Sequence, residues 1–157
     1  RKNFGVVPQT VSLFSGTVGE NITIGVDDYD EKFLLKVSEI SGVMSWLGRT
    51  PNGFDYKLSE GGKELSGGQR QTIAIARALI RKPHYIILDE PTANMDTATE
   101  QLVLKNLGEY FKDETVLIVT HRMAPLSLVS RIVVLDNGKV NVDGPKEKIL
   151  ERLKGAA

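Results

Sequence analysis

The chain has 157 residues, of which 41% are hydrophobic, and its 20 Lys and Arg residues balance 20 Asp and Glu residues. This length and composition fit one globular domain, and the net charge of zero argues against a protein that coats nucleic acid or binds an acidic membrane surface. The sequence has no Cys and only two His residues, which excludes a disulfide framework and a Cys- or His-rich metal cluster.

The first half is predicted to begin with a strand and continue as helices. Residues 4–7 are strand-like, whereas the spacing between 27 and 58 is helical and no strand is evident there. A further helix is predicted at 70–81, where Pro83 ends it. We therefore expect a helical insertion in this half. The predicted apolar face of its first long helix consists of Phe33, Leu34, Val37 and Ile40.

The second half alternates strands with helices. Apolar runs at 84–88, 115–119 and 131–135 are typical of a parallel sheet buried on both faces, because half-exposed strands alternate apolar and polar residues. A helix from Thr97 to Phe111 is predicted between the first two runs, with Thr97 and Glu100 spaced as a capping box. The residues expected on its buried face are Leu102, Val103, Leu107, Tyr110 and Phe111.

The end of the chain is predicted to form a hairpin and a helix. Asn137-Gly138 separates the run at 131–135 from 139–142, and this dipeptide is typical of a tight hairpin turn, here at a sheet edge. Residues 146–153 have the pattern of an amphipathic helix.

Two adjacent glycines stand out in the segment Leu65-Ser66-Gly67-Gly68-Gln69, just before the helix at 70–81. Ser66 and Gln69 have capping-box spacing, so by themselves they indicate only a well-capped helix. Capping does not explain the glycines, since each costs about 1 kcal/mol relative to Ala inside a helix. We interpret them as a place where another group must approach the backbone closely, and the free N–H groups at a helix start would attract an anion such as phosphate.

Several polar residues follow the predicted strands. Asp89 and Glu90 end the run at 85–88, and neighbouring side chains on a strand point to opposite faces, so one could hold a cation and the other a water molecule. His121 and Gln9 follow two other strand-like segments, at the sheet edge where open α/β folds bind ligands. Each of them alone could equally be a solvated loop residue, and only their combination indicates a site.

Together these segments resemble the ATP-binding cassette (ABC) ATPases. Residues 14–22 and 59–62 also look like the exporter-type nucleotide-binding domains of that family. The motifs that match in order and approximate spacing are the Q-loop at Gln9, the signature motif at 65–69, the Walker B motif at 86–90, the D-loop at 94–96 and the H-loop at His121.

The resemblance implies an α/β fold, part of a P-loop NTPase (RecA-like) core with a mostly parallel sheet and an inserted helical subdomain that carries the signature motif. Residues 1–157 would form the C-terminal part of one ATPase domain. About 20–82 would be the helical subdomain, and 1–19 and 83–157 would belong to the catalytic core.

One family motif is missing, because the sequence contains no Gly-x-x-x-x-Gly-Lys-Ser/Thr segment. In the family this P-loop precedes the Q-loop, so we expect it upstream of Arg1 and expect the 157 residues alone to bind ATP weakly or not at all, without hydrolysis. The D-loop also departs from the usual exporter form, with Ala93-Asn94-Met95-Asp96 in place of Ser-Ala-Leu-Asp.

By resemblance, two such domains, identical or different, close head to tail around two molecules of ATP with Mg²⁺. Asp89 would hold the magnesium ion, Glu90 would polarise the attacking water, and Gln9 would reach both. His121 would contact the γ-phosphate. The residues expected to contact the nucleotide of the opposite subunit, or to relay between the two sites, are Ser66, Gly67, Gly68, Gln69 and Asp96.

The resemblance implies that the chain is part of the ATPase domain of an exporter. That domain would lie at the cytoplasmic face of a membrane, and we expect the bacterial inner membrane. The second expected partner is a transmembrane domain, and no nucleic-acid partner is expected. Residues 9–22 look like the branch of the family that exports proteins or peptides. Leu13 and Phe14 either contact that membrane domain or pack inside the helical insertion. The alternatives are a soluble translation-associated ABC protein, a DNA-repair relative and a non-catalytic module; the DNA-repair relatives carry a long coiled coil between Q-loop and signature that is absent from this sequence.

Overall fold

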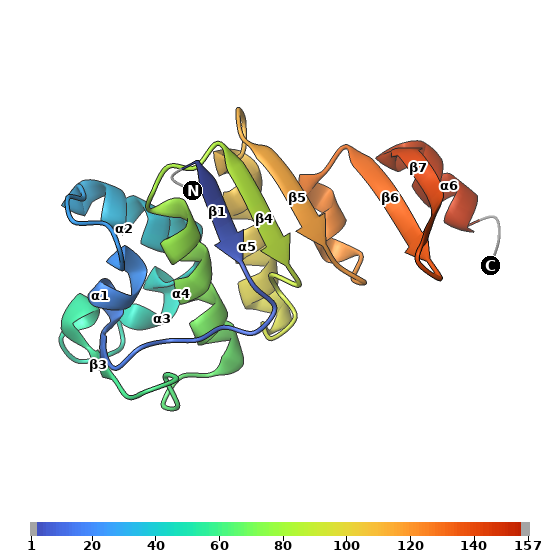
Figure 1. Cartoon of the computed structure of the whole chain (residues 1–157). Helices are drawn as coiled ribbons and strands as arrows, with labels where there is room; N and C mark the ends of the chain where they lie inside the picture. Colours follow the sequence, from blue (N-terminus) through green and yellow to red (C-terminus); the bar gives the residue numbers. More distant parts are fainter. Residues whose placement is uncertain (1–2, 155–157) are drawn as a thin grey trace.

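A computed structural model describes residues 3–154 of the chain (Figure 1). Its main sheet is parallel, with the strand order β1-β4-β5, where β1 is Phe4–Val7, β4 is Tyr85–Asp89 and β5 is Thr115–Val119. Val7 pairs with Leu88, and Asp89 pairs with Val119. The three strands therefore end at one edge, and the segments that follow them lie there together.

Only one face of this sheet is covered by the residues that the structure describes. The inward side chains include Val7, Ile86 and Leu88, each at most 1% exposed, and Figure 1 shows α5 (Thr97–Tyr110) behind the strands and α4 (Gly67–Leu79) beside β1. The prediction of burial on both faces was therefore wrong for residues 3–154. The apolar side chains of the opposite face that are roughly half exposed are Phe4, Val6, Tyr85, Leu117 and Val119.

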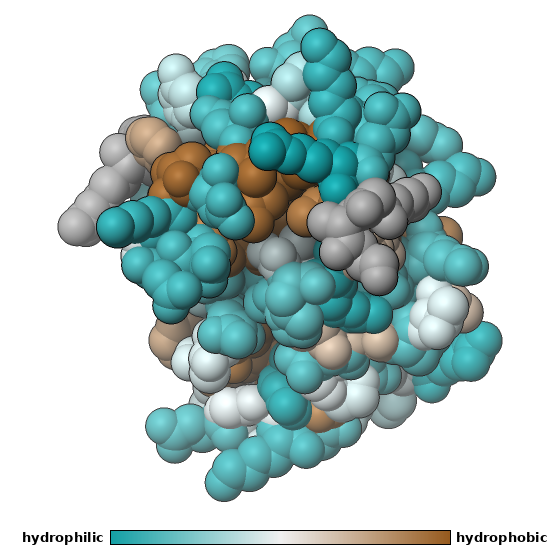
Figure 2. Space-filling view, turned by 90° about the vertical axis from the view of Figure 1, so that its right-hand side faces the viewer, coloured by the Kyte–Doolittle hydropathy of each residue, from teal (hydrophilic) through white to brown (hydrophobic). Residues whose placement is uncertain are grey.

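The predicted hairpin is present but belongs to a separate sheet. Within residues 3–154, strands β6 (Arg131–Asp136) and β7 (Lys139–Pro145) pair only with each other, in antiparallel register, and α6 (Lys146–Lys154) follows. Figure 1 places all three beyond β5, at the opposite end of the molecule from α1 and α2. Figure 2, viewed from this end, shows a patch of hydrophobic residues framed by hydrophilic ones.

Between β1 and β4 the chain forms α1 (Val18–Thr23), α2 (Glu31–Ile40), α3 (Met44–Leu47) and a 3-10 turn, Gly53–Asp55. The predicted face of α2 is confirmed, because Leu34, Val37 and Ile40 are buried and Phe33 packs against the core. The absence of a strand was wrong: β2 (Gly16–Thr17) pairs with β3 (Lys57–Leu58). Two-residue strands carry no periodicity, so sequence spacing cannot reveal them.

Helix α5 begins differently from the prediction. Its N-cap is Asp96, whose carboxylate accepts the backbone N–H of Thr99 at 3.0 Å, so Thr97 and Glu100 form no capping box. The predicted buried face is right for Val103 and Leu107, each 0% exposed, but Leu104 is buried at 8% exposed, whereas Leu102 is 41% exposed. In residues 3–154, no helix has both the length and the apolar character that crossing a bilayer requires.

Candidate active site

Glu90 is the most constrained side chain at the carboxyl edge of the sheet. It is 7% exposed, and its backbone has a φ of 46°, a left-handed conformation that is uncommon for a residue other than Gly. One carboxylate oxygen, Oε1, accepts the backbone N–H of His121 at 2.9 Å and lies 2.7 Å from the His121 ring Nδ1. The other oxygen accepts the Thr120 hydroxyl at 3.2 Å. The loop after β5 thus fixes the carboxylate from two sides.

The charge of Glu90 follows from these contacts. Burial raises the pKa of the carboxyl, but the hydrogen bonds from the His121 ring, the His121 backbone and Thr120 together outweigh burial, and the pKa lies below its ordinary value. Glu90 is therefore ionised at neutral pH. Because a carboxylate can only accept hydrogen bonds, the His121 ring must carry its hydrogen on Nδ1 in this arrangement.

Asp89 and Gln9 lie at the same edge as Glu90. Asp89 is the last residue of β4 and is half buried, while Gln9 follows β1 by two residues and is exposed. No hydrogen bond joins Gln9 to the other candidate residues within the described part of the chain. Residues 3–154 hold no cluster of three or more His, Cys, Asp or Glu side chains for a metal. This donor set still fits Mg²⁺, which binds through one or two carboxylates together with substrate phosphates.

The signature segment begins α4 as predicted. The Ser66 hydroxyl accepts the Gln69 backbone N–H at 3.1 Å, and the Gln69 side chain accepts the Ser66 N–H at 2.8 Å, so both halves of the capping box are present. The helix starts at Gly67 rather than at Arg70.

The two glycines are needed by a contact within the chain. A Cβ atom on Gly67 would lie 2.9 Å from Cβ of Asn94, and one on Gly68 would lie 2.9 Å from the Asn94 carbonyl oxygen. Asn94 lies in the segment 94–96 that was compared with a D-loop. The close approach that the glycines predict is therefore made within the chain by Asn94, and a phosphate contact at the same helix start stays a prediction.

Asp96 has a structural role that the sequence did not indicate. Besides capping α5, it accepts the Thr99 hydroxyl at 2.7 Å. Hydrogen bonds from the Thr99 side chain and backbone lower the pKa of Asp96, so the carboxylate is ionised. The Asp96 side chain is exposed at the surface, so it can still contact another molecule while it caps the helix.

Sequence reasoning missed a buried polar network behind the site. Arg122 donates to the Thr92 carbonyl at 2.6 Å and to Glu100 at 2.9 Å, and the Thr92 hydroxyl donates to Glu100 at 2.6 Å. Thr92 and Glu100 are 1% and 6% exposed. This network joins the loop after β5 to the loop after β4. A charged residue directly after His121 was its only signal in the sequence.

The alternatives for Leu13 and Phe14 are now separated. Leu13 is 3% exposed and packs inside the molecule, whereas Phe14 is 51% exposed and lies 5.5 Å below the Arg77 guanidinium. Arg77 also donates to the Asn21 carbonyl at 2.8 Å, and burial lowers its pKa. Internal packing therefore holds for Leu13, and Phe14 remains available at the surface.

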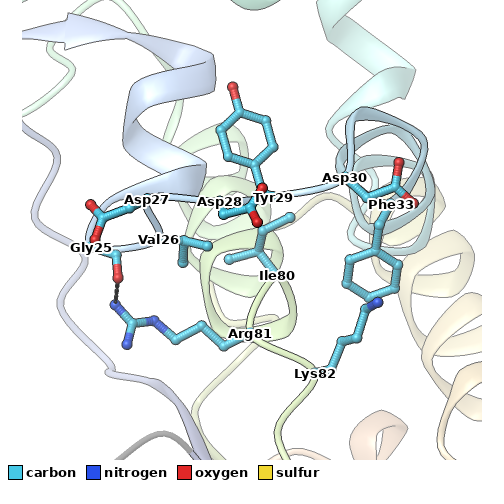
Figure 3. Close-up of a pocket in the computed structure, with 10 residues that line it drawn as sticks. All are labelled: Gly25, Val26, Asp27, Asp28, Tyr29, Asp30, Phe33, Ile80, Arg81 and Lys82. Carbon is cyan, nitrogen blue, oxygen red and sulfur yellow. Dashed lines mark hydrogen bonds between the residues drawn. The ribbon is translucent and has the colours of Figure 1, made fainter.

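A separate hollow of about 530 Å³ lies between α4 and the loop before α2 (Figure 3). Figure 3 shows Arg81 reaching the Gly25 carbonyl, a hydrogen bond of 2.6 Å, and the Lys82 ammonium 4.4 Å from the Phe33 ring. None of the candidate catalytic residues lines this hollow. Its lining residues are Gly25, Val26, Asp27, Asp28, Tyr29, Asp30, Phe33, Ile80, Arg81 and Lys82.

Comparison with solved structures gives the fold a family context. A structure described as a bacterial Atm1-family ABC exporter with ATP bound matches the whole chain with a TM-score of 0.89 and 32% identity, and the chain covers 29% of that protein. The α/β fold with a parallel sheet, predicted as part of a P-loop NTPase core, is thereby confirmed.

Proteins with similar sequences support the same family as the structural match. The chain is 37% identical over 153 residues to an ATP-dependent lipid A-core flippase of Haemophilus influenzae, and 34% identical over 152 residues to ABC transporter B family member 13 of Arabidopsis thaliana. Each alignment includes 97% of this chain, which spans 26% of the first relative and 12% of the second. The model of the ABC transporter family matches residues 1–93, more than half of the chain. The chain therefore belongs to the ABC transporter family.

Proposed function

We propose that the full-length protein hydrolyses ATP and that Glu90 polarises the attacking water. The observation that carries this proposal is the fixed, ionised carboxylate of Glu90 at the carboxyl edge of the sheet, held by His121 and Thr120. A general base that is positioned in this way contributes about 10² to 10⁴ in rate. The carboxylate of Glu90 is ionised, so it can accept a hydrogen bond from the attacking water.

The remaining candidate residues fit the same reaction. Asp89 would bind Mg²⁺ and Gln9 would reach the metal and the water, both from the edge where Glu90 lies. The bound ion would neutralise charge on the phosphates. The family's nucleotide contacts would come from Ser66 and the N–H groups at the start of α4, since helix N-termini favour anions.

We further propose that two such domains close around ATP and drive an exporter through a transmembrane domain. The supporting observation is that similar proteins are named as an ABC exporter and as a flippase. In this proposal residues of about 20–82 form the helical subdomain, exposed Phe14 faces the membrane domain, and the ATPase lies on the cytoplasmic side. Soluble translation or DNA-repair functions are not favoured by these relatives.

The test compares ATP hydrolysis by the full-length protein and two variants that replace a carboxylate with an amide. Glu90→Gln should lower kcat by about 10² to 10⁴ and leave ATP binding intact. Glu109→Gln makes the same change on the exposed face of α5 and should match the wild type. Wild-type turnover by Glu90→Gln would refute the assignment of Glu90, and no turnover by the wild-type protein would refute the ATPase proposal itself.

A further inference from the structure

Gln71 is a buried amide on the helix that carries the signature motif. It lies in the second turn of α4 and is 0% exposed, and the other buried residues of this helix, such as Ile73 and Ala74, are mostly apolar. An amide that is removed from water destabilises a protein unless its hydrogen bonds are replaced. The contacts of Gln71 therefore reveal what this position requires.

Both ends of the Gln71 amide bind backbone of the loop that follows β4. Its Nε2 donates to the Glu90 carbonyl oxygen at 2.6 Å, and its Oε1 accepts the Asn94 backbone N–H at 3.3 Å. One side chain thus bridges the general-base candidate and the D-loop segment. The partners are main-chain groups, so the bridge fixes the path of the loop and not merely the direction of a side chain.

The bond to Glu90 lies where the backbone is least relaxed. A non-glycine residue with positive φ persists only when its surroundings hold it there. The Glu90 N–H donates to the Val119 carbonyl at 2.9 Å, and the Glu90 carbonyl also accepts the Ala93 N–H at 3.2 Å. Gln71 adds the shortest of these three bonds. It therefore holds the peptide group directly after Glu90, which sets where the carboxylate points.

The other end of the amide acts where α4 meets the D-loop segment. Asn94 packs against Gly67 and Gly68 at the start of the same helix, and Gln71 binds the Asn94 N–H from the next turn. Gln71 therefore connects the signature helix to both Glu90 and Asn94.

We propose that Gln71 is a positioning residue that ties the signature helix to the Glu90 backbone, so that the carboxylate is aligned only when the helix is in place. This inference rests on the proposed ATPase function. It predicts that loss of the bridge slows the chemical step while ATP binding is retained, because misplacement of a catalytic group by about 1 Å can lower a rate about 100-fold.

The test uses Gln71→Met in the full-length protein, since Met has a similar length and cannot make either hydrogen bond. We expect kcat to fall about 10- to 100-fold, with the KM for ATP changed by less than about twofold. The matched control is Thr72→Val on the next residue of α4. Thr72 is also 0% exposed and accepts the Trp46 indole N–H at 3.0 Å, away from Glu90, so this variant should lower the melting temperature but keep kcat within about twofold. Equal kcat losses in the two variants would overturn the proposal.

A double-variant cycle separates positioning from general damage. If Gln71 acts through Glu90, then Gln71→Met should change the residual rate of a Glu90→Gln protein by less than about twofold, because coupled residues are not additive. A full additional loss would overturn the inference. If Gln71→Met melts below the assay temperature, Gln71→Glu replaces it as the test. This variant keeps the acceptor for the Asn94 N–H but loses the donor to the Glu90 carbonyl, and we expect the same loss of kcat. An inactive wild type would instead indicate failure of the proposed function.

Discussion

The His121 ring nitrogen Nδ1 lies 2.7 Å from Oε1 of Glu90, and the His121 backbone N–H donates to the same oxygen at 2.9 Å. A change of side chain at 121 can remove the first contact but not the second. The exposed His121 side chain, 81% accessible, thus has one fixed nitrogen and leaves the rest of its ring free for a ligand.

The activity of His121 variants should depend on the ring contact, because the backbone contact is kept in every variant. We expect His121→Ala to lower kcat by about 100-fold or more, because it loses the ring contact to Glu90 and the proposed phosphate contact. His121→Gln should retain more activity, since its amide can donate one hydrogen bond. Steady-state ATPase rates at saturating ATP will rank the variants. The reverse order would contradict a hydrogen-bonding role for this ring.

Glu90 should make the free energy of unfolding decrease as the pH becomes acidic. Its pKa is lowered in the folded protein, so the unfolded chain, with an ordinary Glu pKa of about 4.3, binds more protons in that range. The contribution of Glu90 is therefore fully present above that value and is lost as the pH falls through the lower folded pKa. Urea unfolding of the intact domain at a series of pH values will measure this loss. The dependence should be weaker in Glu90→Gln, and an unchanged slope would exclude Glu90 as its source.

Alanine at the two signature glycines should give different results. Helix propensity favours Ala by about 1 kcal/mol, while overpacking costs about 1–3 kcal/mol, so each single variant should lose up to about 2 kcal/mol. Asn94→Gly removes the Cβ atom that Gly67→Ala would meet, but it leaves the carbonyl oxygen that Gly68→Ala would meet. Thermal melts should therefore show rescue of Gly67→Ala alone. Equal rescue of both would mean that the loop simply moves away.

The Arg122 network should be sensitive to unpaired charge. Arg122→Met leaves the Glu100 carboxylate, 8% accessible, without its cation, and breaking a buried pair costs about 3–5 kcal/mol. Because the Arg122 side chain is 32% accessible, solvent screening should bring the loss to about 3 kcal/mol or less. Adding Glu100→Gln should recover part of this stability by removing the stranded charge. Denaturant unfolding of the single and double variants will test this, and a purely additive loss would argue against charge pairing.

The strands of four or more residues, the capped signature helix and the family motifs were predictable because each depends on neighbours in the chain. Ser66 and Gln69 close their capping box within one helical turn, and the apolar runs at β4 and β5 are local patterns. The capping of α5 was mispredicted because two overlapping segments offered a plausible cap, and Asp96 took the position. Leu102 was placed on the buried face in place of Leu104 because both flank Val103 in the sequence, and only packing shows which side of the apolar stripe is covered.

The sequence by itself determined which residues could act: the glycines, the carboxylates and the histidine are chemical identities in a fixed order. Only the tertiary structure decided how they meet. Glu90 is joined to residues 120 and 121, and to Gln71, across separations of 19 to 31 residues, and no periodicity carries information over such distances. The covered and open faces of the sheet were also decided by packing, because a continuous apolar run shows which side chains favour burial but not which elements cover them.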